Sequence, residues 1–293
     1  MNILLTGINN YLGKKLASSF LEEGHQVSCL VRSETLFLKN TENNPNLSMI
    51  RGDLIREKYS VDFPDNLDVA YYFSLYAVEQ ADIYQELELL ALQNYIKKLR
   101  RVNCTHLVYV IPLRSPVNED VEALLKENYI YYTIVRTSNI VGKSSILMRI
   151  FKHMSSKLAI IATARLAKSR CQPISLRDAL IYLNFIALNP AAFNQRFDIG
   201  GPEILSYREM LDSYLQMNKV KKVIITLPFL HDAFTSFWLS RSSGIPKAIA
   251  KAFSTNIQGD ILCEDNRIHE LFPHKSLKFR EALREAEIGY TIK

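Results

Sequence analysis

The sequence predicts an α/β fold with a parallel sheet at its centre. Residues 1–33 read as a strand, a glycine-rich turn, a helix and a second strand. Strand-like and helix-like segments then alternate as far as residue 136. Parallel strands need helical crossovers between them, so this order is typical of a Rossmann-type, doubly wound sheet.

The first 33 residues contain the strongest local signal. Asn2–Thr6 is an apolar run of strand length, Gly7–Gly13 is a turn, and Lys14–Glu23 has helical periodicity. One face of that helix is apolar, with Leu12, Leu16, Phe20 and Leu21. Gly24 ends the helix, and Gln26–Val31 is the second strand. A glycine turn at a helix N-terminus presents free backbone N–H groups, and this predicts a site for the pyrophosphate of a dinucleotide.

The later elements complete the predicted sheet. We expect strands at Leu47–Arg51, Asp68–Leu75, His106–Pro112 and Tyr131–Arg136, with helices at Val78–Val102 and Val121–Asn128. The pattern changes after Gly142, so residues 1–142 are predicted to form the nucleotide domain. Residues 143–293 are predicted to form a small α+β C-terminal lobe, packed on that domain and partly interleaved with it.

The C-terminal lobe is expected to bind a substrate or a protein partner. Its predicted elements are helices at Ser145–Met154, Ala179–Leu188 and Lys275–Glu287, strands at Arg196–Pro202 and Val223–Leu227, and a capping box at Ser206–Glu209. Four aromatic residues could line an apolar pocket, namely Phe229, Phe234, Phe237 and Trp238, although core packing is the favoured role for each of them taken singly.

Composition excludes several classes of function. The net charge of +6 is spread along the chain, and the densest basic run, residues 97–101, falls at a predicted helix C-terminus, so no nucleic-acid site is expected. The four cysteines lie far apart and the histidines have no ligand-like spacing, which argues against a metal site or a disulfide framework. The apolar runs are too short to span a bilayer, and no signal peptide is recognised, so a cytoplasmic location is expected.

Two residues beyond the turn bear on the cofactor. Arg32 follows the second strand, where an acidic residue would accept hydrogen bonds from an NAD ribose; an arginine suits the 2′-phosphate of NADP(H), which is therefore favoured over NAD(H). A solvated arginine is the alternative. Asp53 follows the third strand and could accept from the adenine amino group, or simply belong to a turn.

Seven motifs in order resemble the atypical short-chain dehydrogenase/reductase proteins that bind NAD(P)H, close to the NmrA-like group and the complex I accessory-subunit type. The motifs are Thr6-Gly7-x5-Gly13, Arg32-Ser33, Gly52-Asp53-Leu54, Asp68–Tyr72, Arg136–Gly142, Gln172–Asp178 and Phe197–Pro202. The resemblance implies a Rossmann domain with a C-terminal lobe over the nicotinamide side. With the turn, it predicts a cofactor site made of Thr6, Gly7, Asn9, Asn10, Tyr11, Leu12, Gly13, Arg32, Ser33, Asp53, Leu54, Ser74 and Leu75.

The sequence departs from the pattern of these proteins at two places. Asn10 replaces the middle glycine of G-x-x-G-x-x-G; asparagine tolerates a left-handed φ, but its side chain could crowd the phosphates. The segment after the fifth strand has no Tyr-x-x-x-Lys, and Arg114 and Ser115 are the only polar groups there that could replace it. Two functions therefore remain open: an oxidoreductase acting on a small carbonyl-type substrate, and a non-catalytic NADP(H)-binding redox sensor or assembly factor. If Asn10 abolishes cofactor binding, the fold is a scaffold.

Overall fold

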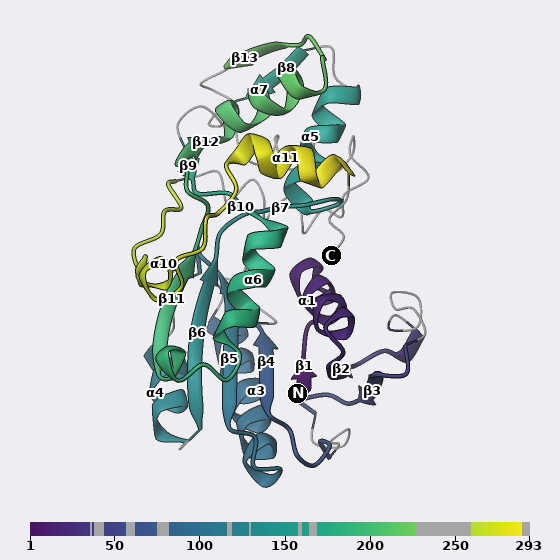
Figure 1. The fold of residues 1–293 in the computed structure, drawn as a ribbon, viewed down its shortest axis with the longest axis vertical. Helices are drawn as coiled ribbons and strands as arrows, with labels where there is room; N and C mark the ends of the chain where they lie inside the picture. Colours follow the sequence, from purple (N-terminus) through teal and green to yellow (C-terminus); the bar gives the residue numbers. More distant parts are fainter. Residues whose placement is uncertain are drawn as a thin grey trace.

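The computed structural model contains a seven-stranded parallel sheet with helices on both faces (Figure 1). It describes residues 1–35, 37, 44–56, 62–74, 82–115, 119–128, 130–157, 160–163, 169–226 and 259–288. The strands are β1 (Asn2–Leu5), β2 (Gln26–Val31), β3 (Leu47–Arg51), β4 (Val69–Phe73), β5 (His106–Pro112), β6 (Tyr131–Thr137) and β11 (Gln195–Ile199). Their order is β11-β6-β5-β4-β1-β2-β3, which confirms the predicted doubly wound sheet.

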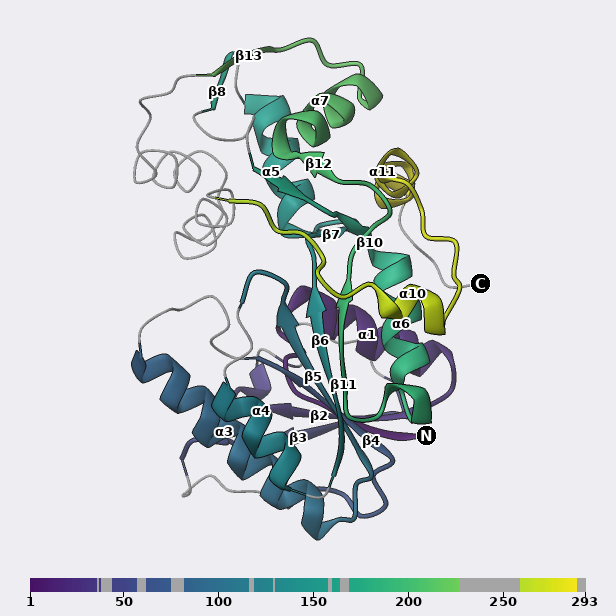
Figure 2. The same ribbon diagram turned by 90° about the vertical axis from the view of Figure 1, so that its left-hand side faces the viewer.

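The central strands β4, β5 and β6 are buried on both faces because helices cover both sides, whereas no residue of the edge strand β3 is buried (Figure 2). Helices α1 (Tyr11–Glu22) and α6 (Leu176–Ile186) pack on one face, and α3 (Asp82–Arg101) and α4 (Glu119–Glu127) pack on the other. Helix α1 begins three residues before the expected Lys14, so Gly13 lies inside its first turn. Leu12, Leu16 and Phe20 bury the predicted apolar face.

A smaller α+β lobe lies beyond the carboxyl ends of the strands (Figure 1). Its described helices are α5 (Ile146–Lys157), α7 (Tyr207–Met217) and α11 (Phe279–Ile288), and its short strands are β7 (Ile140–Val141), β8 (Ile160–Thr163), β9 (Arg170–Cys171), β10 (Ile174–Ser175), β12 (Leu205–Ser206) and β13 (Val223–Thr226). The expected capping box is present: the Ser206 hydroxyl accepts from the Glu209 N–H, and the Glu209 carboxylate accepts from the Ser206 N–H.

The last helix was predicted to begin at Lys275 but begins at Phe279. Directly before the helix, the Leu277 N–H donates to the buried Asp178 carboxylate at 2.9 Å, and the Lys278 N–H donates to the Glu281 side chain at 2.8 Å. Asp178 also accepts from Ser175 at the start of α6 and contacts His274 at 2.8 Å. One carboxylate therefore fastens the C-terminal segment to α6.

The chain returns to the sheet after entering the second lobe. Strand β11 follows the first elements of the lobe in the sequence, yet it pairs with β6 of the central sheet. Helix α6 covers the same face of the sheet as α1. Helix α10 (Arg267–Leu271) packs beside β11, and a single turn of 3-10 helix, η2 (Pro190–Ala192), precedes that strand. The division at residue 142 stays a prediction. The four expected aromatic residues, Phe229, Phe234, Phe237 and Trp238, lie outside the described residues.

Candidate functional site

The turn after β1 requires glycine at two positions. Gly7 has a φ of 73°, and a Cβ there would lie 2.7 Å from the Cβ of Phe73. A Cβ on Gly13 would lie 2.5 Å from the Gly7 carbonyl oxygen, so only glycine lets α1 pack this closely against the turn. The turn lies between β2 and β4, where the strand order reverses, and ligands of doubly wound sheets bind at this point.

Asn10 caps helix α1. Its φ of −80° and ψ of 143° are those of an N-cap, so the left-handed conformation considered from the sequence is not needed. The Oδ1 atom accepts the backbone N–H of Leu12 at 2.9 Å. The middle position of the turn therefore places a carboxamide before the helix N-terminus and uses one of the free N–H groups there.

The other predicted turn residues have distinct roles. The buried Thr6 hydroxyl accepts from the Phe73 N–H at 2.9 Å and so ties β1 to β4, while Asn9 is exposed. The Tyr11 hydroxyl donates to the Lys143 carbonyl at 2.9 Å, which links the turn to the second lobe. Burial raises the pKa of this hydroxyl, so Tyr11 is neutral and acts as a donor. Leu12 lies in the core.

The ends of β2 and β3 bring the next predicted residues together. The Gly52 N–H donates to the Val31 carbonyl, which places Arg32 and Ser33 beside Asp53 and Leu54. Arg32 is exposed and forms no ion pair within the described part of the chain. Asp53 Oδ1 accepts from the N–H groups of Ile55 and Arg56, so this carboxylate caps its own turn, and Leu54 is buried.

Strands β4 and β5 lead to the remaining positions. The Ser74 N–H donates to the Val110 carbonyl, and Leu75 lies outside the described residues. Arg114 and Ser115 form a turn directly after β5, where the Ser115 N–H donates to the Pro112 carbonyl. Helix α4 has no tyrosine in its sequence, so Arg114 and Ser115 stay the polar candidates for proton transfer.

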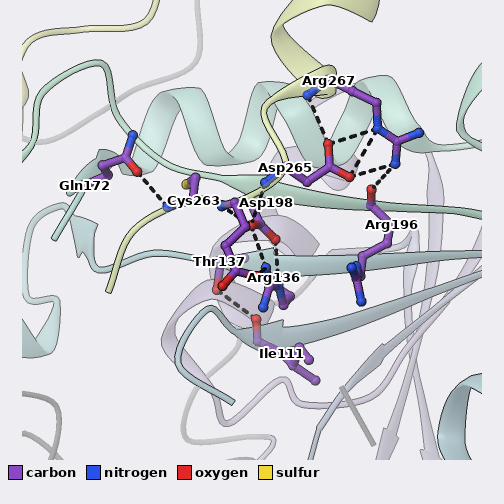
Figure 3. Close-up of polar contacts among 10 residues, drawn as sticks. Ile111, Arg136, Thr137, Gln172, Arg196, Asp198, Cys263, Asp265 and Arg267 are labelled. Atoms are coloured by element: carbon purple, nitrogen blue, oxygen red, sulfur yellow. Dashed lines mark hydrogen bonds and ion pairs between the residues drawn. The ribbon is translucent and has the colours of Figure 1, made fainter. Parts of the chain in front are cut away.

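A buried ion cluster at the carboxyl ends of β6 and β11 was missed from the sequence (Figure 3). Arg136 donates to Asp198 through Nε at 2.6 Å and through Nη2 at 2.7 Å. Asp198 is fully buried and also accepts the N–H groups of Glu264 and Asp265, and Glu264 accepts from Arg136 Nη2 at 2.8 Å. A signal was present, because a charged residue inside an apolar strand requires a partner.

Residues 259–266, here called the strap, connect the lobe to this cluster. Asp260 pairs with Arg170 of β9, and the Cys263 N–H donates to the Gln172 side chain (Figure 3). Asp265 accepts both Nε and Nη2 of Arg267, which also reaches the Arg196 carbonyl. The strap thus crosses the ends of β9 and β11, and its acidic residues are ion-pair partners of arginines.

The described residues include no metal-binding cluster and no membrane-spanning helix. No group of three His, Cys, Asp or Glu side chains among them could hold a metal ion. None of the helices in the described ranges is long and apolar enough to cross a bilayer. The four cysteines are free thiols.

The seven-stranded parallel sheet with helices on both faces defines a Rossmann-type α/β fold, which the chain shares with solved structures of a reductase and a sugar-nucleotide epimerase. No protein-family model matches the sequence, and no curated protein matches it. Solved structures match over nearly the whole chain at low sequence identity, which shows the shared fold.

Three similar structures illustrate the match. Citrobacter sp. triphenylmethane reductase, complexed with NADP(H), has a TM-score of 0.72 at 13% identity, over 98% of this chain and 100% of that chain. The Bordetella bronchiseptica enzyme WbmG, in complex with NAD, has a TM-score of 0.70 at 14% identity, over 98% and 93% of the two chains. A nucleoside-diphosphate-sugar epimerase from Staphylococcus aureus has a TM-score of 0.69 at 14% identity, over 97% and 100%.

Proposed function

We propose that this protein binds NADP(H) at the turn between β1 and α1 and is an oxidoreductase acting on a small carbonyl-type substrate. The observation that carries the proposal is the glycine turn at the strand-order reversal, where Gly13 packs against the Gly7 carbonyl. Similar structures hold NAD or NADP(H), which supports a nicotinamide dinucleotide as the ligand of this site.

The residues at the turn fit such a ligand. Gly7 and Gly13 let β4 and α1 pack closely against the turn, which holds the helix N-terminus at the end of β1, and Asn10 adopts an ordinary extended conformation. Ser33, Asp53 and Leu54 would line the adenosine end, and Ser74 and Leu75 the nicotinamide end. When bound, the nicotinamide supplies the hydride. Arg114 and Ser115 would orient the carbonyl group, and Ser115 would pass a solvent proton to its oxygen.

NADP(H) is preferred in this proposal because of Arg32. The residue after β2 carries a positive charge, is exposed, and makes no ion pair with the described residues, so its guanidinium can meet the 2′-phosphate. A charge-assisted contact of this kind contributes about 1.5–3 kcal/mol, equivalent to about 10–100-fold in affinity. Arg32→Ala should weaken NADPH binding by that factor and leave NADH binding unchanged. Equal weakening of both cofactors would refute the assignment.

A second function is favoured by the missing Tyr-x-x-x-Lys. A protein without this proton-transfer pair could bind NADP(H) without turnover and act as a redox sensor or assembly factor, with its C-terminal lobe presented to a protein partner. NADPH oxidation across a panel of aldehydes, ketones and enones separates the two functions. Turnover that is lost in Ser115→Ala supports the oxidoreductase. Cofactor binding with no turnover across the panel supports the sensor, which further requires partner binding that depends on the nucleotide.

A further inference from the structure

The guanidinium of Arg136 presents two forks, each a pair of N–H donors. The first fork is fully hydrogen-bonded, and within the described part of the chain the second is bonded at only one of its two nitrogens. The Nε and Nη2 atoms bind the two oxygens of Asp198 at 2.6 and 2.7 Å, which is a bidentate pair. The second fork consists of Nη1 and the remaining hydrogen of Nη2. Glu264 accepts from Nη2 at 2.8 Å, and none of the described residues accepts a hydrogen bond from Nη1.

We propose that this second fork of Arg136 binds an anionic group, a carboxylate or a phosphate, of the substrate, and that Glu264 is a built-in occupant which the substrate displaces. Arg136 is 8% exposed, so its position is fixed by the protein rather than by solvent. A planar fork with two parallel N–H donors matches carboxylate and phosphate oxygens, whereas Glu264 uses only one of the two arms.

Glu264 has the properties of a replaceable partner. Its side chain is 76% exposed, while that of Asp198 is fully buried. The Glu264 backbone N–H is held by Asp198 Oδ2 at 2.7 Å, so the side chain can swing away without moving the strap. Arg136 and Asp198 form a neutral pair, and an incoming anion therefore exchanges one negative charge for another. With a carboxylate, the exchange adds no net charge to the cluster.

The end of β6 lies beside the turn that carries Arg114 and Ser115, because the Leu113 N–H donates to the Thr137 carbonyl at 2.7 Å. Ile111 of β5 is the register partner of Arg136, and its carbonyl accepts from the neighbouring Thr137 hydroxyl at 3.4 Å (Figure 3). Three residues further along, Arg114 and Ser115 follow β5. A substrate whose anionic end bound Arg136 would place its neighbouring atoms near this turn. The substrate class, a carbonyl compound carrying a carboxylate or phosphate, rests on the proposed function, but the anion site itself does not.

The test is ligand-detected NMR titration of the full chain, with and without saturating NADPH. The probes are pyruvate and inorganic phosphate as anions, acetone as an uncharged carbonyl compound, and tetramethylammonium as a cation. Glu264→Ala removes the internal competitor, and exposed ion pairs contribute about 0.2–1 kcal/mol, so anion affinity should rise by about 1.5–5-fold. Glu264→Gln removes the charge but keeps an acceptor. Glu270→Gln, an exposed carboxylate on α10, controls for the general effect of charge.

The outcomes separate this inference from the proposed function. Anion binding that tightens in Glu264→Ala and stays unchanged in Glu270→Gln supports the site. Preference for pyruvate over phosphate, or the reverse, identifies the group. Anion binding that both variants change equally, or no anion binding at all, overturns the inference, as does tetramethylammonium binding that Glu264→Ala abolishes. If anions bind as expected and NADPH does not, the anion site stands and the proposed function fails.

Discussion

The buried carboxylate of Asp198 should be the most stabilising charged group at the junction of the two lobes. It is fully buried and accepts two hydrogen bonds from Arg136 and two from the strap backbone. Asp198→Asn keeps the volume but removes the charge and replaces one acceptor by a donor. Breaking a buried pair by removing one partner costs about 3–5 kcal/mol, because the other charge is left uncompensated. We expect the free energy of unfolding to fall by that amount.

The exposed partner of the same arginine provides a matched control. Glu264→Gln makes the same chemical change on the same guanidinium, but the Glu264 side chain is 76% exposed, and exposed pairs contribute about 0–1 kcal/mol. Urea unfolding followed by far-UV circular dichroism measures both variants. Equal destabilisation by the two variants, or less than about 1 kcal/mol for Asp198→Asn, would refute this reasoning.

Three further predictions concern stability. Burial lowers the pKa of His106 from 6.5 to about 4, so the folded protein keeps this imidazole neutral. As the pH falls, His106 takes up a proton in the unfolded chain before it does so in the folded protein. Its contribution to the free energy of unfolding is complete above pH 6.5 and should decrease by about 3 kcal/mol between pH 6.5 and 4. In urea titrations His106→Asn should lack this part of the pH dependence, and a pH profile equal to that of the wild type would contradict the assignment. Ser206→Ala should lower the unfolding free energy by about 1 kcal/mol, measured in the same way, because it removes the cap of α7, and no change would show that the cap is dispensable. Gly142→Ala would place a Cβ 2.5 Å from the Tyr11 hydroxyl and 2.8 Å from the Leu176 Cβ, so it should destabilise by about 1–3 kcal/mol. Adding Tyr11→Phe should recover part of that loss in thermal unfolding, whereas strictly additive effects would argue against the contact.

Helices and strands were predicted well where the residues of the segment itself determine its structure. His106–Pro112 and Gln26–Val31 were predicted with their observed bounds. The first is buried over nearly its whole length and reads as an almost continuous apolar run. The capping box at Ser206 needs only residues three apart. The contact of Leu277 with Asp178 directly before α11 was not predictable, since the two residues lie about a hundred positions apart in the chain.

The sequence predicted those parts of the candidate site that depend on residues close together in the chain. Gly7 and Gly13 are recognisable because their roles are local. The N-cap role of Asn10 is also local, since asparagine directly before a helical segment is a common cap. The pairing of Arg136 with Asp198 spans 62 residues and depends on β11 lying beside β6, which local patterns do not specify.

Cofactor binding by the unmodified chain is the most direct test of the proposed function. Isothermal titration calorimetry with NADPH and NADH, on the wild type and on Asn10→Gly, should give saturable binding with NADPH about 10–100-fold tighter than NADH. The glycine variant should bind at least as tightly, because it frees the Leu12 N–H. Absence of binding heat for both cofactors in both proteins would contradict the assignment of the β1–α1 turn as a dinucleotide site.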